Sequence, residues 1–386
     1  MKIAVLGAET TKFGELWDRS PRSLVGEAVD GALSQAGIDR SAIDALFVGN
    51  MLSGILGAQE QLGALFREEL ALGSIPAVKI EGACASGGLA VHQAVLGILS
   101  GLYETVLVVG VEKMTDHAPS EVSRALTAAS SEGERSAGAT FPGLYALIAR
   151  AHMEQYGTTE EQMAAVAVKN HFHASLSEKA HFRNTITLEQ VMKSAKIADP
   201  LKLLDCSPIS DGASAVILSS KGQEVRSKEK KVSIVASGVA TDSISLNGRD
   251  ELTSLKATKV AAGVAYNQAN VSPKDIDVAE VHDCFTIAEI LAMEDLGFYK
   301  AGEAVHHIKQ WETQLGGRGL IVNTSGGLKA SGHPVGATGV KQIVEIVKQL
   351  QGNLGKRQVE GAKIGLTHNV GGTGGTAVVH ILKQEA

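Results

Sequence analysis

The sequence predicts an α/β fold made of two similar halves, with an extra domain inserted into the first half. Three observations support this prediction. Short apolar runs alternate with segments of helical spacing, several segments recur in the same order in both halves, and one long stretch has no counterpart in the second half. Because strands that alternate with helices usually lie side by side in the same direction, we expect a parallel sheet with helices on its faces.

Hydrophobic spacing and chain-stopping glycines define the expected elements of the first half. Leu24, Ala28, Ala32 and Leu33 lie at helical spacing, and Gly37 follows as a stop. By the same reasoning we expect helices at 23–36, 59–70 and 89–99, and strands at 2–7, 43–48, 75–80 and 105–111. The strand at 75–80 is expected to be short and buried.

Four pairs of matching segments suggest an internal duplication. Chance resemblance among small and apolar residues explains one match, but hardly four in the same order. The pairs are Ile3–Gly7 with Ile234–Gly238, Gln35-Ala36 and Ile43-Asp44 with Gln268-Ala269 and Ile276-Asp277, Ala85-Ser86-Gly87 with Ala330-Ser331-Gly332, and Gly212, Ala215, Val216 and Ile217 with Gly374, Ala377, Val378 and Val379.

The repeat also indicates the domain organisation. We expect residues 1–115 plus 205–230 to form the N-terminal half, closed by a strand at 213–218, and residues 231–386 to form the C-terminal half. Residues 116–204, which contain a polar stretch and helical segments at 145–156 and 160–173, are expected to form the inserted domain. An insertion beside a site often closes over a long substrate.

Composition places the chain among ordinary soluble proteins of a reducing compartment. The net charge of -6 argues against general nucleic-acid binding, although a few local basic groups could still hold a phosphorylated small molecule. Three cysteines, an odd number, do not make a disulfide framework. The N-terminus lacks a signal-peptide pattern, and apolar runs are too short to span a bilayer. We therefore expect a cytoplasmic protein that binds no membrane.

Cys84 is the candidate nucleophile, and it lies where a strand turns into a helix. Free backbone N–H groups and the helix dipole at that position favour an anion, so we expect them to lower the pKa of the thiol. Taken alone, Cys84 has an ordinary explanation as a small buried residue in a tight turn. Its significance depends on the second half of the chain.

Four further reactive side chains occur near turns of the second half. His282 and Cys284 follow the expected strand at 276–281, His333 lies in the segment that repeats the Cys84 turn, and His368 follows the expected strand at 363–367. Each alone has a structural explanation. Together with Cys84 they provide what a thiol nucleophile requires, namely a base and a second proton carrier.

Two other kinds of site are disfavoured by the spacing of these residues. The cysteines and histidines lack a close pair such as Cys-x-x-Cys, so we expect no metal site. The glycines at 371–375 are not followed by Lys-Ser or Lys-Thr, and no Gly-x-Gly-x-x-Gly opens a helix after the first strand. These glycines instead let backbone approach a substrate closely.

The pattern resembles the thiolase family over nearly the whole chain. The resemblance rests on the Cys84 segment, Asp211-Gly212-Ala213, Gly332-His333-Pro334-x-Gly336-Ala337-x-Gly339 and the glycine-rich C-terminal strand. It implies a duplicated, layered αβαβα fold with an inserted loop domain. Most thiolases carry Asn-Glu-Ala-Phe where this chain has His282-Asp283-Cys284-Phe285, and a cysteine-containing loop where it has His368-Asn369. Both departures, and the segment 197–206, resemble the sterol-carrier-protein-type thiolases and their archaeal and bacterial relatives.

The resemblance implies residue roles in acyl transfer between thioesters of coenzyme A, which serves as substrate rather than as a bound cofactor. Cys84 would form the acyl-enzyme, and His333 would accept the thiol proton. Cys284 would be the acid/base at the α-carbon, while His282 and His368 would bind oxyanions or orient Cys284. The backbone N–H of Cys84 and of Gly371 or Gly372 would complete a second oxyanion hole. Tyr145 and its neighbours are expected near the pantetheine.

The implied activity is acetyl-CoA C-acetyltransferase or 3-ketoacyl-CoA thiolysis, and two alternatives remain open. The first is a decarboxylating ketosynthase, or a hydroxymethylglutaryl-CoA synthase, on the same fold; Cys284 argues against the ketosynthase, which needs no thiol base. The second is a non-catalytic scaffold. Family resemblance also implies a homodimer or homotetramer, and a possible complex with a downstream enzyme that uses coenzyme A thioesters.

Overall fold

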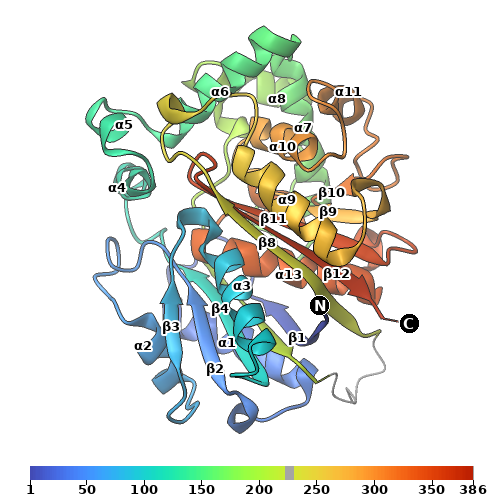
Figure 1. Cartoon of the computed structure of the whole chain (residues 1–386). Coiled ribbons are helices and arrows are strands. Elements are labelled where there is room, and N and C mark those ends of the chain that lie inside the picture. Colours follow the sequence, from blue (N-terminus) through green and yellow to red (C-terminus); the bar gives the residue numbers. More distant parts are fainter. Residues whose placement is uncertain (222–229, 386) are drawn as a thin grey trace.

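A computed structural model describes residues 1–221 and 230–385 of the chain. Within these residues one ten-stranded sheet runs through the molecule in the order β10-β9-β11-β12-β8-β1-β7-β4-β2-β3. The two central strands, β1 and β8, are the opening strands of the two halves, and each half continues outward from them. Figure 1 shows the first half in blue and cyan below the second half in yellow and red.

The first half begins with a strand–helix–strand unit and closes with a strand that comes after the insertion. Its helices are α1 (Pro21–Ala36), α2 (Leu62–Glu69) and α3 (Ser86–Leu99), and its strands are β1 (Ile3–Thr10), β2 (Ala45–Gly49), β3 (Ala77–Ile80), β4 (Thr105–Glu112) and β7 (Gly212–Ser219). Ser20 caps α1 by accepting a hydrogen bond from the backbone N–H of Ser23, and Gly37 ends this helix in the left-handed conformation.

The second half repeats this order with additional short helices. Its helices are α9 (Lys256–Ala269), α10 (Thr286–Asp295), α11 (Ala304–Lys309), α12 (Gly327–Ser331) and α13 (Val335–Gln351), and its strands are β8 (Val232–Thr241), β9 (Val278–Glu280), β10 (Ile321–Val322), β11 (Ile364–Gly371) and β12 (Thr376–Gln384). The predicted helices and strands therefore all exist, with ends shifted by a few residues.

Helices and sheet alternate in five layers. Helices α3 and α13 pack between the strands of the first half and the strands of the second half, in a core that includes Ala94, Val340 and Leu382. Helix α1 covers the opposite face of the strands of the first half, and α9 covers the opposite face of the strands of the second half. The layered α/β class expected from the sequence is confirmed.

Two equivalent aspartates support the duplication. Asp44 accepts hydrogen bonds from the backbone N–H groups of Glu104 and Thr105 at the start of β4. Asp277 accepts the same pair of bonds at the start of β11. The match between Ala85-Ser86-Gly87 and Ala330-Ser331-Gly332 is wrong, because Ser86 is the first residue of α3 whereas Ser331 is the last of α12.

Glycines at the helix–strand contacts are also equivalent. A Cβ on Gly7 would lie 2.0 Å from the backbone oxygen of Ala32 in α1, and a Cβ on Gly238 would lie 2.1 Å from that of Ala261 in α9. Only glycine lets the opening strand and the covering helix approach this closely.

Two expectations about the sheet are wrong. The sheet is mixed, because the closing strands β7 and β12 run antiparallel to both of their neighbours. Strand β3 is not buried; it forms the edge of the sheet, and Val78 on it is 46% exposed. A short strand with a lysine at 79 is typical of an edge.

The inserted segment forms a helical layer beside the second half. It contains the helices α4 (Pro119–Leu126), α5 (Glu132–Ser136), α6 (Phe141–Tyr156), α7 (Glu160–Ser175) and α8 (Leu188–Lys193) and the strands β5 (Lys196–Ala198) and β6 (Leu201–Lys202). Helix α7 packs on α10, α11 and α12 of the second half. Figure 1 shows α7 beside α10 and α11 near the top of the view. The expected domain limits at 115/116, 204/205 and 230/231 stay predictions. Residues 222–229, just before the last limit, and Ala386 lie outside the described residues.

A helix that spans a membrane needs sufficient length and apolar character. No helix in the described part of the chain is long and apolar enough to cross a bilayer.

Candidate active site

Cys84 lies in a single turn of 3₁₀ helix, Ala83–Ala85, between β3 and α3. Ser86 holds this turn: its hydroxyl donates to the backbone oxygen of Ala83 at 2.6 Å and accepts from the N–H of Gly82 at 3.0 Å. Ala83 has a φ of 52°, a left-handed conformation that is strained for a residue with a side chain. The turn thus holds the thiol at the start of α3 with its backbone fixed on both sides.

His333 occupies the equivalent position in the second half. Cys84 precedes the first residue of α3 by two positions, and His333 precedes the first residue of α13 by two positions. The two helix ends cross so closely that a Cβ on Gly87 would lie 2.7 Å from the backbone oxygen of Gly336. Glycines at this crossing therefore bring the thiol of one half beside the imidazole of the other.

Thr338 fixes the tautomer of His333. The Thr338 hydroxyl has one proton and donates it to the backbone oxygen of Pro334 at 3.0 Å. Its oxygen therefore accepts from Nδ1–H of His333, 2.7 Å away. Nε2 of His333 keeps its lone pair and has no hydrogen-bond partner among the described residues. This is the atom that can accept a proton from a thiol.

Asn369 gives His282 the opposite tautomer. The Oδ1 atom of Asn369 accepts from the N–H of Gly88 at 3.1 Å, which places the amide nitrogen on the other side. That nitrogen donates to the backbone oxygen of Cys84 at 2.9 Å and to Nδ1 of His282 at 3.3 Å. Nε2 of His282 therefore carries the proton, and it has no partner in the described structure. It is available as a hydrogen-bond donor.

The three reactive groups meet at one point. Sγ of Cys84 and one ring nitrogen each of His282 and His333 all lie within 4.8 Å of one another. The two imidazoles are in edge contact, with ring centroids 5.2 Å apart and planes at 85°. A proton acceptor and a proton donor thus stand beside the same thiol.

Burial controls the charge of these groups. Burial lowers the pKa of His333 to about 3, and burial together with its histidine neighbours lowers that of His282 well below the usual value, so both rings are neutral near pH 7. Burial also raises the pKa of Cys84 to about 12, and the N–H of Gly372 opposes this only in part. The predicted lowering of the Cys84 pKa by the helix N-terminus is therefore wrong. The thiol needs a base at the moment of attack.

Cys284 lies in the wall of the same cavity as Cys84. The cavity has a volume of about 180 Å³ and contains both thiols and His333, with mostly apolar side chains around them. Its lining is Cys84, Ser123, Leu126, Phe141, Pro142, Tyr145, Cys206, Ser207, Ile209, Cys284, Phe285, His333 and Gly372. Burial raises the pKa of Cys284 well above its usual value, whereas a hydrogen bond with Tyr145 lowers it.

His368 lies away from this cavity. Strand β11 extends to Gly371, so His368 is inside the strand rather than after it. Side chains alternate along a strand, and Asn369 faces Cys84, so His368 faces the opposite side. There its Nε2 atom lies 2.9 Å from the hydroxyl of Thr258 in α9. The structure thus brings together Cys84, His282, His333 and Cys284, but not His368.

Sequence reasoning assigned no role to Asn369, Thr338 or Asp283. Asp283 accepts hydrogen bonds from the backbone N–H groups of Leu328 and Lys329 and so holds the first turn of α12, which leads to His333. Each of the three residues lies within a quoted motif, directly beside a reactive residue or within five positions of one. That proximity was the only signal in the sequence.

The donor set fits a metal poorly. Cys84, His282 and His333 could each offer one ligand atom. A metal at Nε2 of His282 would require that atom to give up its proton, and the amide of Asn369 opposes this by donating to Nδ1. Metal-bound imidazoles instead donate their second N–H to an acceptor.

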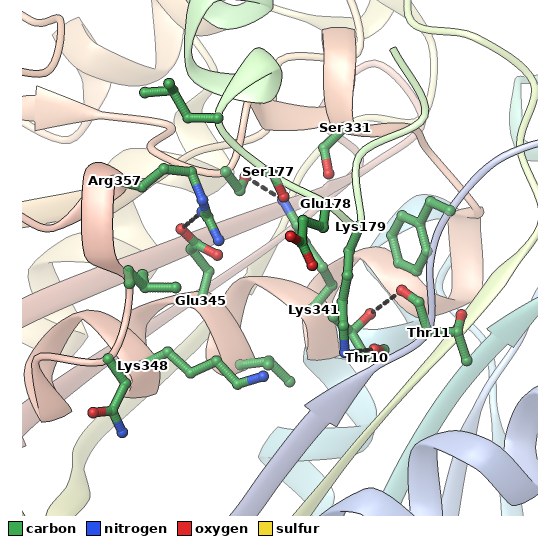
Figure 2. A pocket seen from close by; sticks show the side chains of 16 residues that line it. Thr10, Thr11, Ser177, Glu178, Lys179, Ser331, Lys341, Glu345, Lys348 and Arg357 are labelled. Atoms are coloured by element: carbon green, nitrogen blue, oxygen red, sulfur yellow. Dashed lines mark hydrogen bonds and ion pairs between the residues drawn. The ribbon is translucent and has the colours of Figure 1, made fainter. Parts of the chain in front are cut away.

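A second and larger cavity, of about 310 Å³, lies between β1, the end of α7 and the C-terminal part of α13. Figure 2 shows its charged lining, including the ion pair between Arg357 and Glu345. Its other basic groups are also paired: Lys179 and Lys348 with Glu9, and Lys341 with Glu280. None of the reactive residues lines this cavity.

Family models match almost the whole chain. Residues 3–222 match "Thiolase, N-terminal domain", and residues 238–384 match "Thiolase C-terminal domain-like". Among curated proteins, the chain is 49% identical over 382 residues to an acetyl-CoA acetyltransferase of Methanothermobacter thermautotrophicus, with 99% of each chain covered. It is 34% identical to sterol carrier protein 2 of Bos taurus, covering 99% of this chain and 72% of that protein.

Solved structures show the same fold. An Ltp2-ChsH2(DUF35) aldolase superposes with a TM-score of 0.84 at 26% identity, covering 99% of this chain and 98% of the other. An acetyl-CoA acetyltransferase from Syntrophomonas wolfei superposes with a TM-score of 0.75 at 21% identity, covering 100% and 99%.

Proposed function

The chain belongs to the thiolase family, and on that premise we propose that it condenses two molecules of acetyl-CoA through an acetyl group on Cys84. The resemblance to thiolases and the enzyme class expected from the sequence, a thiolase that transfers acyl groups between CoA thioesters, are confirmed. One observation supports the residue roles most directly. The ring of His333, with an unprotonated Nε2, and the ring of His282, with a protonated Nε2, stand beside the same thiol.

Acetylation begins with the Cys84 thiol. Its sulfur attacks the thioester carbonyl of acetyl-CoA while Nε2 of His333 takes the thiol proton. Nε2–H of His282 donates to the carbonyl oxygen as negative charge develops there. The proton on His333 then passes to the departing sulfur of coenzyme A. The backbone N–H of Gly372, which donates to Sγ in the free protein, and that of Cys84 are available to the oxygen of the acetyl group.

Condensation needs a second proton carrier, and we assign this role to Cys284. Once coenzyme A has left, Nε2 of His333 is unprotonated again and takes the proton of the Cys284 thiol in the same cavity. The Cys284 thiolate takes a proton from the methyl group of a second acetyl-CoA. The resulting carbanion attacks the acetyl carbonyl, the sulfur of Cys84 leaves, and acetoacetyl-CoA forms. The proton held by His333 restores the Cys84 thiol, and Cys284 is again a neutral thiol. His368 has no part in this proposal, because its ring faces α9.

The cavity supports a short acyl group. Its volume of about 180 Å³ and its bulky walls, Phe141, Tyr145 and Phe285, leave little room for a long chain beside the thioester. The 49% identical relative is described as an acetyl-CoA acetyltransferase, which agrees with this choice. Coenzyme A enters and leaves as substrate and product, and the proposal includes no resident cofactor.

We further propose a cytoplasmic homodimer or homotetramer active in lipid metabolism. The three cysteines are free, which suits a reducing compartment. The exposed edge of β3 offers unpaired backbone groups to a second copy of the chain. An enzyme that uses acetoacetyl-CoA is the proposed partner, and a similar structure, the Ltp2-ChsH2(DUF35) aldolase, joins two components in its name.

Two variants test the roles of the cysteines. Cys84→Ala should form no acyl-enzyme on incubation with acetyl-CoA, as read by intact-protein mass spectrometry. Cys284→Ala should still be acetylated at Cys84 but should fail to exchange the methyl protons of acetyl-CoA with solvent deuterium. Acetylation of Cys84→Ala at the wild-type level would refute the assignment of Cys84 as the nucleophile. Normal proton exchange by Cys284→Ala would refute the assignment of Cys284 as the base. Condensation that requires a malonyl thioester would favour the ketosynthase alternative.

A further inference from the structure

Tyr145 lines the same cavity as the two catalytic thiols and interacts with both of them. Tyr145 comes from α6 of the inserted segment, and its side chain is buried. The hydroxyl donates to the backbone oxygen of Gly372 at 3.0 Å and is also hydrogen-bonded to Cys284. The N–H of Gly372 in turn donates to the sulfur of Cys84. One phenol therefore contacts Cys284 directly and Cys84 through a single residue.

The hydroxyl has one proton for two acceptors. While Cys284 is a neutral thiol, the phenol proton goes to Gly372, and the S–H group can donate to the phenol oxygen. When Cys284 loses its proton, the sulfur becomes the stronger acceptor, because hydrogen bonds to a charged partner are about twice as strong as neutral ones. Rotation of the O–H about its bond to the ring then serves the thiolate without any change in the position of the ring. No proton leaves the phenol in this step.

We propose that Tyr145 is a positioning residue that holds Cys284 against the substrate and turns its O–H toward the sulfur when the thiolate forms. The inference rests on the proposed function, since it assumes that Cys284 is the base. The ring is well suited to a fixed hydroxyl: it packs on Phe285, the residue after Cys284, with ring centroids 4.6 Å apart. Packing fixes the ring, so only the O–H moves.

The surroundings of Cys284 explain why such a donor is needed. The titratable groups that shift its pKa are Tyr145 from α6, Cys84 from the turn before α3, and Asp283 beside it in the chain, and Cys206 and His333 also line the cavity. Cys84 and Asp283 both disfavour a second negative charge. Burial disfavours the charge further. The Tyr145 hydroxyl and the backbone N–H of Phe285 are the groups that act in the opposite direction.

Tyr145→Phe removes only the hydroxyl and separates the two half-reactions. We expect acetylation of Cys84 to stay within about threefold of wild type, because that step loses only an indirect, neutral hydrogen bond. We expect exchange of the methyl protons to fall about 10- to 100-fold, the size expected for a hydrogen bond to a charged group. The limb of the exchange pH profile that reports Cys284 should move upward by about one pH unit.

Tyr266→Phe is the matched control. Its hydroxyl also donates to a backbone oxygen, that of Leu296, at 2.8 Å, and it lies outside the cavity. This variant should leave the exchange rate and its pH profile unchanged. An equal fall in exchange for both variants would show a general cost of losing a tyrosine hydroxyl and would overturn the inference.

A double variant separates positioning from a purely structural role. If Tyr145 acts through Cys284, adding Tyr145→Phe to Cys284→Ala should lower the residual exchange no further. Additive losses would overturn the inference, as would normal exchange in Tyr145→Phe alone. Failure of the wild-type protein to become acetylated or to exchange protons would instead refute the proposed function. The two failures are therefore distinguishable.

Discussion

Asn369→Asp tests whether the amide sets the protonation of His282. The two side chains have nearly the same size, and a carboxylate can still accept a hydrogen bond from the N–H of Gly88. In the wild-type structure this N–H lies 3.1 Å from Oδ1 of Asn369. It cannot donate, so the bonds to the backbone oxygen of Cys84 at 2.9 Å and to Nδ1 of His282 at 3.3 Å are lost. The favoured arrangement becomes Nδ1–H of His282 donating to the carboxylate. Nε2 then has a lone pair where the thioester oxygen needs a donor.

The magnitude follows from these contacts. Removal of one oxyanion donor costs about 10²–10³ in rate, and we expect the acetylation rate to fall by that factor. Losing two buried hydrogen bonds, with one carbonyl left facing a carboxylate, should also reduce the free energy of unfolding by about 2–4 kcal/mol. Single-turnover acetylation with acetyl-CoA, quenched and read by mass spectrometry, measures the first quantity, and urea denaturation measures the second.

The control is Asn267→Asp, which adds the same charge at an exposed position of α9. It should leave the acetylation rate unchanged and lower the free energy of unfolding by at most about 1 kcal/mol, because a negative charge in the last turn of a helix opposes the helix dipole. If Asn369→Asp were acetylated within about threefold of wild type while folded, less than the cost of one neutral hydrogen bond, the tautomer argument would be wrong.

Two further substitutions test other contacts of the described structure. Thr338→Val removes the acceptor for Nδ1–H of His333, so the tautomer with a free Nε2 lone pair is no longer favoured. Single-turnover acetylation should therefore slow about 10-fold, and an unchanged rate would contradict the argument. Asp211→Asn should lower the free energy of unfolding at pH 7 by about 3 kcal/mol in urea denaturation, because it breaks a buried ion pair with Lys113. Although burial raises the pKa of Asp211, Lys113 and several hydrogen bonds lower it overall. The stabilisation is therefore present above the unfolded pKa of about 3.9 and is lost as the pH falls through the lower folded pKa; a difference that persisted at pH 2 would contradict it.

The sequence predicted the fold well because its repeat carries topological information. The matched pair Asp44 and Asp277 fixes the same β-strand start in both halves, and that equivalence is readable from spacing alone. The protonation state of the Cys84 thiol was harder to predict. A helix N-terminus lowers the pKa of a thiol, but burial acts in the opposite direction at Cys84, and burial depends on packing that spacing does not reveal.

The direction of side chains along a strand was also hard to predict. His368 and Asn369 are adjacent in the sequence and equally polar, and only the pleat of β11 decides which of them faces Cys84. A strand end misplaced by four residues, from 367 to 371, hid this alternation. The pattern of reactive residue types therefore located the site, whereas the residues that orient them required the three-dimensional arrangement.

The equivalent positions of Cys84 and His333 have a consequence for the origin of the site. Each stands two residues before its helix, and the two helix ends meet at crossing glycines. In an ancestral pair of identical half-length chains, both positions would have held the same residue, giving two thiols or two imidazoles. Once the two halves differ in sequence, one position can serve as nucleophile and the other as base. Catalysis by this thiol–imidazole pair therefore depends on the divergence of the two halves, because neither half alone contains both groups.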